Sequence, residues 1–152
     1  MSTLPSSTPE VPAPREARDL LLSAARAVSL KAYAPYSRFR VGAALLGSDG
    51  KLYTGCNVEN ASYSLTLCAE RNALFHAIAA GCRTFRALAI VAQRPVPPCG
   101  ACLQALAEFC PPQMPIFLDA FDAERSTPVE TTLGALFPNP FGSADLSKGG
   151  TP

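Results

Sequence analysis

Residues 65–81 read LTLCAERNALFHAIAAG, and this stretch decides the fold because its Ala, Leu, Phe and Ile residues predict a buried helix over Cys68–Ala80. The glycine that follows predicts the C-cap of this helix. Glu70 and Arg71 come in its first turn, and Glu70 is two residues after Cys68. Charged residues rarely lie inside a core without a partner. The chain therefore has either an exposed first turn here or a site that uses the pair.

A second helix is predicted in PPCGACLQALAEFCPP, residues 97–112, because prolines bracket a run from about Gly100 to Cys110. Asp49-Gly50, between two apolar runs, predicts a β-hairpin. The other predicted elements are a helix from Glu16 to about Ala34 that Pro35 ends, the hairpin strands in VGAALLGSDGKLYTGCNV (41–58), a central strand in FRALAIVAQ (85–93), a strand in MPIFLDA (114–120) and a short helix in TTLGALFPNPF (131–141) that Pro138 breaks. This order predicts an α/β fold, a three-layer α/β/α domain with a mixed central sheet.

The chain of 152 residues has the length of one domain, which we place at residues 15–142. Residues 1–14 contain four prolines and predict a disordered leader, and residues 143–152 are expected to form a flexible C-terminal tail. The composition is globular, with 48% apolar and only 16% charged residues, and such a lean surface hints at self-association.

The charge pattern and the chain ends limit the possible partners. The formal net charge is +1 and no run of Lys or Arg occurs, so a nucleic-acid partner is not expected. No stretch approaches the roughly 18 to 20 apolar residues of a membrane span, and the N-terminus lacks the features of a signal peptide. We therefore expect a cytoplasmic protein with no membrane partner and a small-molecule ligand.

Six cysteines in a reducing compartment are expected to be metal ligands, nucleophiles or buried thiols rather than disulfides. Cys99 and Cys102 form a CxxC pair at a predicted helix start, which is typical of a redox dithiol or of half a zinc site. Cys68, at the start of another helix, could supply a third soft ligand. Three protein ligands leave one position for water, as in catalytic zinc sites. A closed structural zinc site in a protein-binding module, with Cys56 or Cys110 as fourth ligand, is the non-enzymatic alternative.

The zinc hypothesis gives the charge pair a role. If Cys68 lies at the very beginning of its helix, Glu70 can border the same cavity and act as a general base. Arg71 could then donate to the thiolates and offset their excess negative charge. Without a metal site, the alternative is an exposed Glu70 stabilised by the helix dipole beside a surface Arg71.

The pattern CxE followed by PCxxC is the three-cysteine form of a zinc deaminase signature. The sequence resembles the small, homotetrameric cytidine deaminases of pyrimidine salvage, within the cytidine and deoxycytidylate deaminase superfamily. The resemblance runs from about Leu20 to Phe141, and it rests on AYAPYSRFRVGAALL (32–46), GCNVENASYSLTLCAERNAL (55–74) and PPCGACLQALAEF (97–109).

The resemblance implies one zinc ion per chain, held by Cys68, Cys99 and Cys102, with Glu70 as the proton shuttle. It implies that Phe39 stacks on the pyrimidine and that Asn57 and Glu59 hold the ribose, with Ala69 also at the substrate. From sequence alone, Phe39 could equally be a core aromatic residue.

The resemblance also implies a homotetramer with shared active sites. Ala61, Tyr63 and Phe141 match positions that reach a neighbouring subunit's site in family members. Two positions depart from the expected pattern: Leu103 replaces an Arg after PCxxC, and Ser64 replaces a common Gly after ASY. Neither change touches a predicted ligand or the base.

The remaining candidates have no ligand spacing. His76 is the only histidine and is expected to be structural. Cys56, Cys82 and Cys110 are expected to be free and mostly buried thiols.

The function that these features imply is hydrolytic deamination of cytidine and deoxycytidine, which gives uridine or deoxyuridine and ammonia. Glu70 would take a proton from water and deliver protons to the ring N3 and the leaving amine. One alternative substrate is another cytosine-bearing nucleoside, such as an aminoacylnucleoside antibiotic. A polynucleotide substrate is less favoured because the chain lacks a basic strand-binding surface.

Overall fold

The computed structural model describes residues 14, 16–122, 124 and 127–147. Its elements are α1 (Arg18–Ser29), β1 (Gly42–Gly47), β2 (Leu52–Cys56), the 3-10 helix η1 (Tyr63–Leu65), α2 (Ala69–Ala79), β3 (Phe85–Ala92), α3 (Gly100–Ala107), β4 (Pro115–Ala120), β5 (Val129–Thr132), α4 (Leu133–Leu136) and α5 (Ser143–Ser147). The five strands form one sheet in the order β2-β1-β3-β4-β5. β3 and β4 are parallel, and the other neighbours are antiparallel, so the sheet is mixed.

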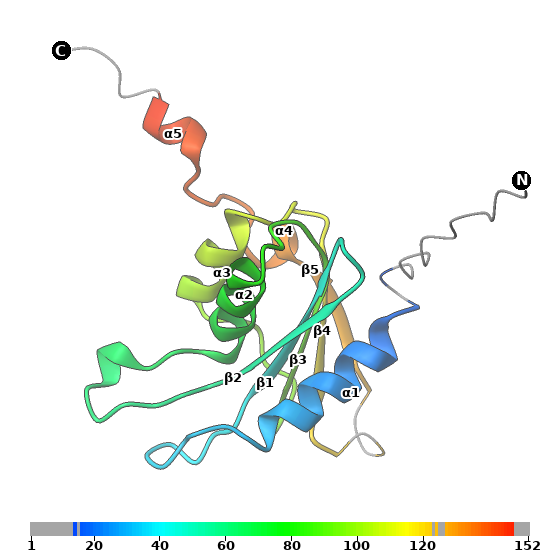
Figure 1. Cartoon of the computed structure of the whole chain (residues 1–152), viewed down its shortest axis with the longest axis vertical. Coiled ribbons are helices and arrows are strands. Elements are labelled where there is room, and N and C mark those ends of the chain that lie inside the picture. Colours follow the sequence, from blue (N-terminus) through cyan, green and yellow to red (C-terminus); the bar gives the residue numbers. More distant parts are fainter. Residues whose placement is uncertain (1–13, 15, 123, 125–126, 148–152) are drawn as a thin grey trace, which may run out of the picture.

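Helices cover both faces of the sheet (Figure 1). β1 is buried along its whole length, as expected of a strand enclosed on both sides. Ala44 and Leu46 face α1 and pack with Leu21, while Ala43 and Leu45 face α2 and α3 and pack with Leu74. The predicted three-layer α/β/α arrangement is confirmed.

The hairpin, the helix after Cys68 and the strands in residues 85–93 and 114–120 are confirmed, and β3 is the central strand. Gly50 has a φ of 79° in the hairpin turn, and Gly81 has a φ of 91° after α2, so both adopt conformations that favour glycine. The short helix before Pro138 is also present as α4.

Two predicted helix ends were wrong, and two elements were not predicted. α1 ends at Ser29 rather than near Ala34, because the backbone of Tyr33 pairs with the strand-like segment after β2: its N–H donates to Asn57 and its carbonyl accepts from Glu59. α3 ends at Ala107 rather than Cys110. Two elements were not predicted: η1 and the edge strand β5.

The predicted leader and tail lie at the two ends of the chain. Of the predicted leader, 1–14, all but residue 14 lies outside the described residues. In the predicted tail, α5 is a short helix that stands apart from the sheet in Figure 1, and residues 148–152 are not described. Among the described residues, no helix is long and apolar enough to cross a lipid bilayer.

The helices lie unusually close to the sheet at two glycines. A Cβ atom at Gly42 would stand 2.0 Å from the carbonyl oxygen of Ala25 in α1. A Cβ atom at Gly55 would stand 2.3 Å from the backbone nitrogen of Ala73 and 2.6 Å from the carbonyl oxygen of Ala69, both in α2. Because Gly55 in β2 has no side chain, the first turns of α2 can lie this close to the sheet.

Candidate functional site

The starts of α2 and α3 bring three thiols together. Cys68 is the N-cap of α2 and Cys99 is the N-cap of α3, both with extended backbone, and Cys102 lies in the first turn of α3. The Sγ atom of Cys99 is 3.8 Å from that of Cys68 and 3.6 Å from that of Cys102. All three Sγ atoms lie within 4.8 Å of one another. The prediction that these cysteines converge from two helix N-termini is confirmed.

The sulfur separations fit a tetrahedral zinc ion. With Zn–S bonds of about 2.3 Å, two thiolate ligands of a tetrahedral zinc stand about 3.8 Å apart, close to the two measured distances. Thiolates are also among the ligands that zinc prefers. Within the described part of the chain, no fourth His, Cys, Asp or Glu joins this group. The three cysteines therefore supply three of the four ligands of a tetrahedral zinc ion.

Glu70 is the second residue of α2, and only 6% of its surface is exposed. It lines a cavity of about 280 Å³ together with Cys68, Cys99 and Ala69. Burial raises the pKa of its carboxyl to about 7, and the nearby Cys68 thiolate adds to this effect. Cys68 and Glu70 border one cavity because Cys68 precedes the helix rather than lying within it.

Arg71, in the first turn of α2, lies beside Cys68. Its Nη2 atom is 3.9 Å from the Sγ of Cys68 and donates to the carbonyl of Thr66 at 3.4 Å. A hydrogen bond from Cys102, supported by Arg71, lowers the pKa of the Cys68 thiol to about 5, whereas the same hydrogen bond raises the pKa of Cys102. The cluster thus favours a thiolate at Cys68 and has a guanidinium at its edge.

The other end of the cavity is formed by the segment before β1 and the segment after β2. Phe39, Asn57 and Glu59 all line it. The Asn57 side chain joins the two segments: its Oδ1 accepts from the N–H of Val41 at 2.8 Å, and its Nδ2 donates to the carbonyl of Phe39 at 2.8 Å. The sequence did not predict that the Asn57 side chain hydrogen-bonds to the segment that carries Phe39 and holds it in place.

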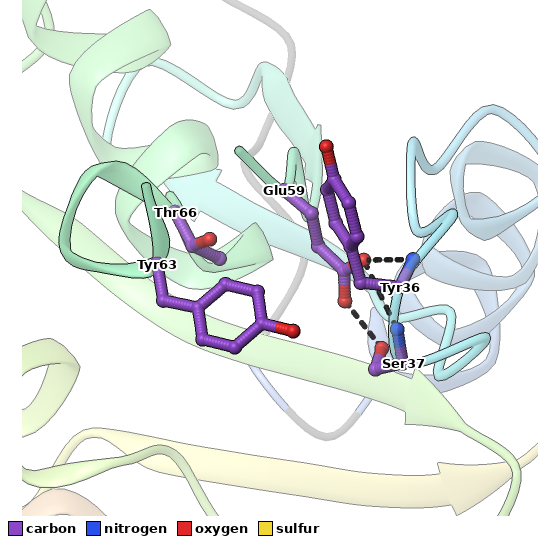
Figure 2. Close-up of a pocket in the computed structure, with 5 residues that line it drawn as sticks. All are labelled: Tyr36, Ser37, Glu59, Tyr63 and Thr66. Atoms are coloured by element: carbon purple, nitrogen blue, oxygen red, sulfur yellow. Dashed lines mark hydrogen bonds between the residues drawn. The ribbon is translucent and has the colours of Figure 1, made fainter. Parts of the chain in front are cut away.

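A second hollow, of about 340 Å³, adjoins the first and shares Ser37, Glu59 and Thr66 with it. Figure 2 shows the side chains of Tyr36 and Tyr63 on either side of this hollow, with Glu59 between the segments that carry them. The two rings meet edge to face, with centroids 5.9 Å apart. Glu59 therefore stands where the two spaces meet.

The three residues predicted to contact a neighbouring subunit lie outside the first cavity. Ala61 is exposed, and Tyr63 lines the second hollow with 73% of its surface exposed. Phe141 is 59% exposed, and its carbonyl accepts a hydrogen bond from Gln104 at 2.8 Å.

The two departures from the expected pattern lie in different surroundings. Leu103 is 8% exposed and belongs to the core between the sheet and α2 and α3, so its side chain packs rather than compensates charge. Ser64 is exposed within η1.

The residues without ligand spacing stand apart from the cluster. His76 is exposed, its Nδ1 lies 3.2 Å from the carbonyl of Thr54, and its ring meets Tyr53 edge to face. Cys82 and Cys110 are buried free thiols and Cys56 is a half-buried one.

Several lining residues were missed by sequence reasoning. Ser37 and Thr66 lie at the junction of the two hollows, and Val41, Ile90, Val96 and Pro97 complete the wall of the first. A serine hydroxyl can accept a hydrogen bond from the backbone two residues further on, which forms a local turn. Such a turn could have pointed to Ser37, whereas the apolar wall has no local signature.

Comparison with known proteins assigns this site to a family. The family model for the cytidine and deoxycytidylate deaminase zinc-binding region matches residues 15–118, a range that contains all three clustered cysteines. The chain belongs to the cytidine and deoxycytidylate deaminase family. Zinc is accordingly the cofactor of this family member, and the three-cysteine cluster is the group of residues that fits it.

Individual cytidine deaminases are similar over most of their length. The cytidine deaminase of Sporosarcina psychrophila is 49% identical over 129 residues, which cover 84% of this chain and 93% of the relative. That of Halalkalibacterium halodurans is 47% identical over 132 residues, covering 86% and 98%. The crystal structure of the cytidine deaminase from Burkholderia pseudomallei superposes with a TM-score of 0.76 at 48% identity, covering 81% of this chain and 98% of that one.

Proposed function

We propose that this chain catalyses the zinc-dependent hydrolytic deamination of cytidine to uridine and ammonia. The observation that carries this proposal is the buried Glu70 carboxyl facing one cavity with the thiols of Cys68 and Cys99. The similarity to cytidine deaminases supports the choice of substrate. A zinc ion held by Cys68, Cys99 and Cys102 supplies Lewis acidity, which makes water a nucleophile near neutral pH.

Glu70 carries the protons in the proposed reaction. Its carboxylate accepts a proton from the attacking water while the water oxygen bonds to C4 of the cytosine ring. The carboxyl gives this first proton to N3. It then takes the proton of the new C4 hydroxyl and passes it to the exocyclic amine, so that the bond between C4 and the amine breaks, ammonia leaves and the C4 carbonyl of uridine forms. Burial of Glu70 excludes bulk water from this exchange.

The remaining residues position the substrate. Phe39 stacks on the pyrimidine, and Ala69, at the start of α2, lies against the base. Asn57 and Glu59 hold the sugar, each with the hydrogen-bonding capacity left over from its contacts within the protein. If that contact is to the 3′-hydroxyl, deoxycytidine is a substrate as well.

Assembly and cellular role are part of the same proposal. Tyr63 and Phe141 expose most of their aromatic surface. Such exposure supports a homotetramer in which these residues and Ala61 complete a neighbouring subunit's site. Arg71 offsets the charge of the thiolates. The free cysteines support a cytoplasmic enzyme, with pyrimidine salvage as its role.

The decisive experiment follows cytidine by ultraviolet absorbance while zinc is counted per chain. Glu70→Gln should keep one zinc per chain and lose nearly all turnover, by roughly the 10²- to 10⁴-fold that general acid–base catalysis contributes, or more. Glu108→Gln is the matched control, since Glu108 is an exposed carboxylate at the end of α3. Retained turnover in Glu70→Gln would remove Glu70 from the mechanism.

A comparison of substrates tests the other half of the proposal. Cytidine should be turned over faster than a cytosine nucleoside with a large acyl substituent. The reverse preference would favour the aminoacylnucleoside class, for which the adjoining hollow of about 340 Å³ offers room.

A further inference from the structure

The backbone of Phe39 is held on both sides. Its N–H donates to the Oγ of Ser37 at 3.0 Å, and its carbonyl accepts from the Nδ2 of Asn57 at 2.8 Å. Two fixed peptide groups fix the direction of the Cα–Cβ bond between them. The point from which the Phe39 ring extends into the cavity is therefore set by its two hydrogen-bond partners.

Ser37 also bonds to Glu59. The Ser37 hydroxyl donates to Oε1 of Glu59, while Oε2 accepts from the N–H groups of Tyr36 at 2.9 Å and of Ser37 at 3.2 Å (Figure 2). A hydroxyl has one proton and two lone pairs. With its proton directed to Glu59, the Ser37 oxygen presents a lone pair to the Phe39 N–H.

Arg38, between the two, has a left-handed backbone with φ of 57°. This conformation is uncommon for a residue other than glycine and persists where neighbouring contacts enforce it. Its N–H donates to the carbonyl of Ala34 at 3.0 Å, and its carbonyl accepts from Gln93 at 3.3 Å. Without the Ser37 hydroxyl, the turn at Arg38 would lose the bond from Ser37 to Glu59 on one side and the bond at the Phe39 N–H on the other.

We propose that Ser37 is a positioning residue that ties the Phe39 ring to the Glu59 carboxylate, so that the base-stacking and sugar-holding groups are fixed relative to each other. The inference rests on the proposed function, because it takes Phe39 as the surface on which the base stacks. The hydrogen bonds of the Ser37 hydroxyl go to Glu59 and Phe39 and to neither the thiol cluster nor Glu70, so Ser37 acts through those two residues.

The kinetic test uses Ser37→Ala, Ser37→Thr and the control Ser23→Ala, whose serine is exposed on α1. Loss of one hydrogen bond corresponds to about 2- to 12-fold in an equilibrium constant, so Ser37→Ala should raise KM for cytidine by about that factor, with a smaller change in kcat. Ser37→Thr keeps the hydroxyl and should restore most of the affinity. Ser23→Ala should leave both constants unchanged.

A double substitution separates positioning from general stability. In a Phe39→Ala background, Ser37→Ala should raise KM by less than it does with Phe39 present, because no ring remains to be positioned and only the bond to Glu59 is lost. An additional rise equal to that seen with Phe39 present would overturn the proposal, as would an unchanged KM in Ser37→Ala alone.

Amide hydrogen exchange gives a readout that does not depend on turnover. The Phe39 N–H should exchange about tenfold faster in Ser37→Ala than in the wild type, and Ser23→Ala should not change it. If the wild type fails to deaminate cytidine, the proposed function falls, and exchange alone decides the role of Ser37. Unchanged exchange at Phe39 would overturn that role.

Discussion

Replacing Gly55 in β2 by alanine should displace the start of α2 and so lower the activity of the site that this helix start carries. The new Cβ atom would stand 2.3 Å from the nitrogen of Ala73 and 2.6 Å from the carbonyl oxygen of Ala69. Ordinary contact begins near 3.4 Å, so α2 must move away from β2 by about 1 Å. Both clashing atoms are backbone, so no side chain can rotate to make room.

Two magnitudes follow from this shift. Overpacking of this kind costs about 1 to 3 kcal/mol in the free energy of unfolding. Because Cys68 and Glu70 sit at the moved end of α2, a shift of about 1 Å should lower kcat/KM by about 100-fold. Urea denaturation measures the loss of unfolding free energy, and the absorbance assay with cytidine measures the fall in kcat/KM.

Gly100→Ala is the matched control, because Gly100 begins α3 beside Cys99 and a Cβ atom there meets nothing within 4 Å. Its stability should stay within about 0.5 kcal/mol of the wild type. If Gly55→Ala unfolds at the same urea concentration as the wild type and keeps its kcat/KM, the close approach of β2 and α2 does not position the site.

Two further predictions concern groups away from the cavity. Asp119 is 3% exposed, and its carboxylate accepts from the Nη2 of Arg26 at 2.8 Å. Asp119→Ala should therefore lower the free energy of unfolding by about 2 kcal/mol in a urea titration. Asp19→Ala breaks the exposed pair with Arg18 and should lower it by less than about 1 kcal/mol. The Tyr53 hydroxyl donates to Asp49 at 2.6 Å, which lowers the pKa of Asp49 and raises that of Tyr53 to about 12. The stabilisation is therefore complete between about pH 4 and pH 10, is lost as pH falls through the lowered pKa of Asp49, and is lost again as pH rises towards 12. Urea titrations across pH should show wild type and Tyr53→Phe converging at both extremes, and a constant difference would contradict this account.

The sequence predicts the central layers because strong local signals coincide with them. The Asp49-Gly50 turn and the glycine after α2 each stand at a chain reversal that favours their backbone conformation. β5 was missed because its four residues, VETT, lie at the sheet edge and are exposed or half-buried, without the alternation that marks a strand. Pro35 was an insufficient guide to the end of α1, since pairing of Tyr33 with the segment after β2 ends the helix earlier.

In the candidate site, too, some features were predictable from the sequence and others were not. The convergence of the cysteines follows from their places at two helix starts, and the proximity of Glu70 follows from Cys68 being an N-cap. The contacts of Asn57, Glu59 and Ser37 depend on how two loops meet across 16 to 23 positions of sequence. Such tertiary contacts leave no local pattern, and neither does the left-handed turn at Arg38.

The position of the cysteines along the chain has a consequence for folding. Cys68 and Cys99 are 31 positions apart in the sequence, and the residues between them include the whole of α2 and of the central strand β3. A zinc ion that stays bound to both would link these elements into a closed ring, much as a disulfide would. By the loop-entropy relation for a cross-link, a ring of this size would lower the conformational entropy of the unfolded chain by the equivalent of about 3 to 4 kcal/mol. In the proposed enzyme, the two cysteines would therefore hold the zinc ion and also cross-link the middle of the sheet.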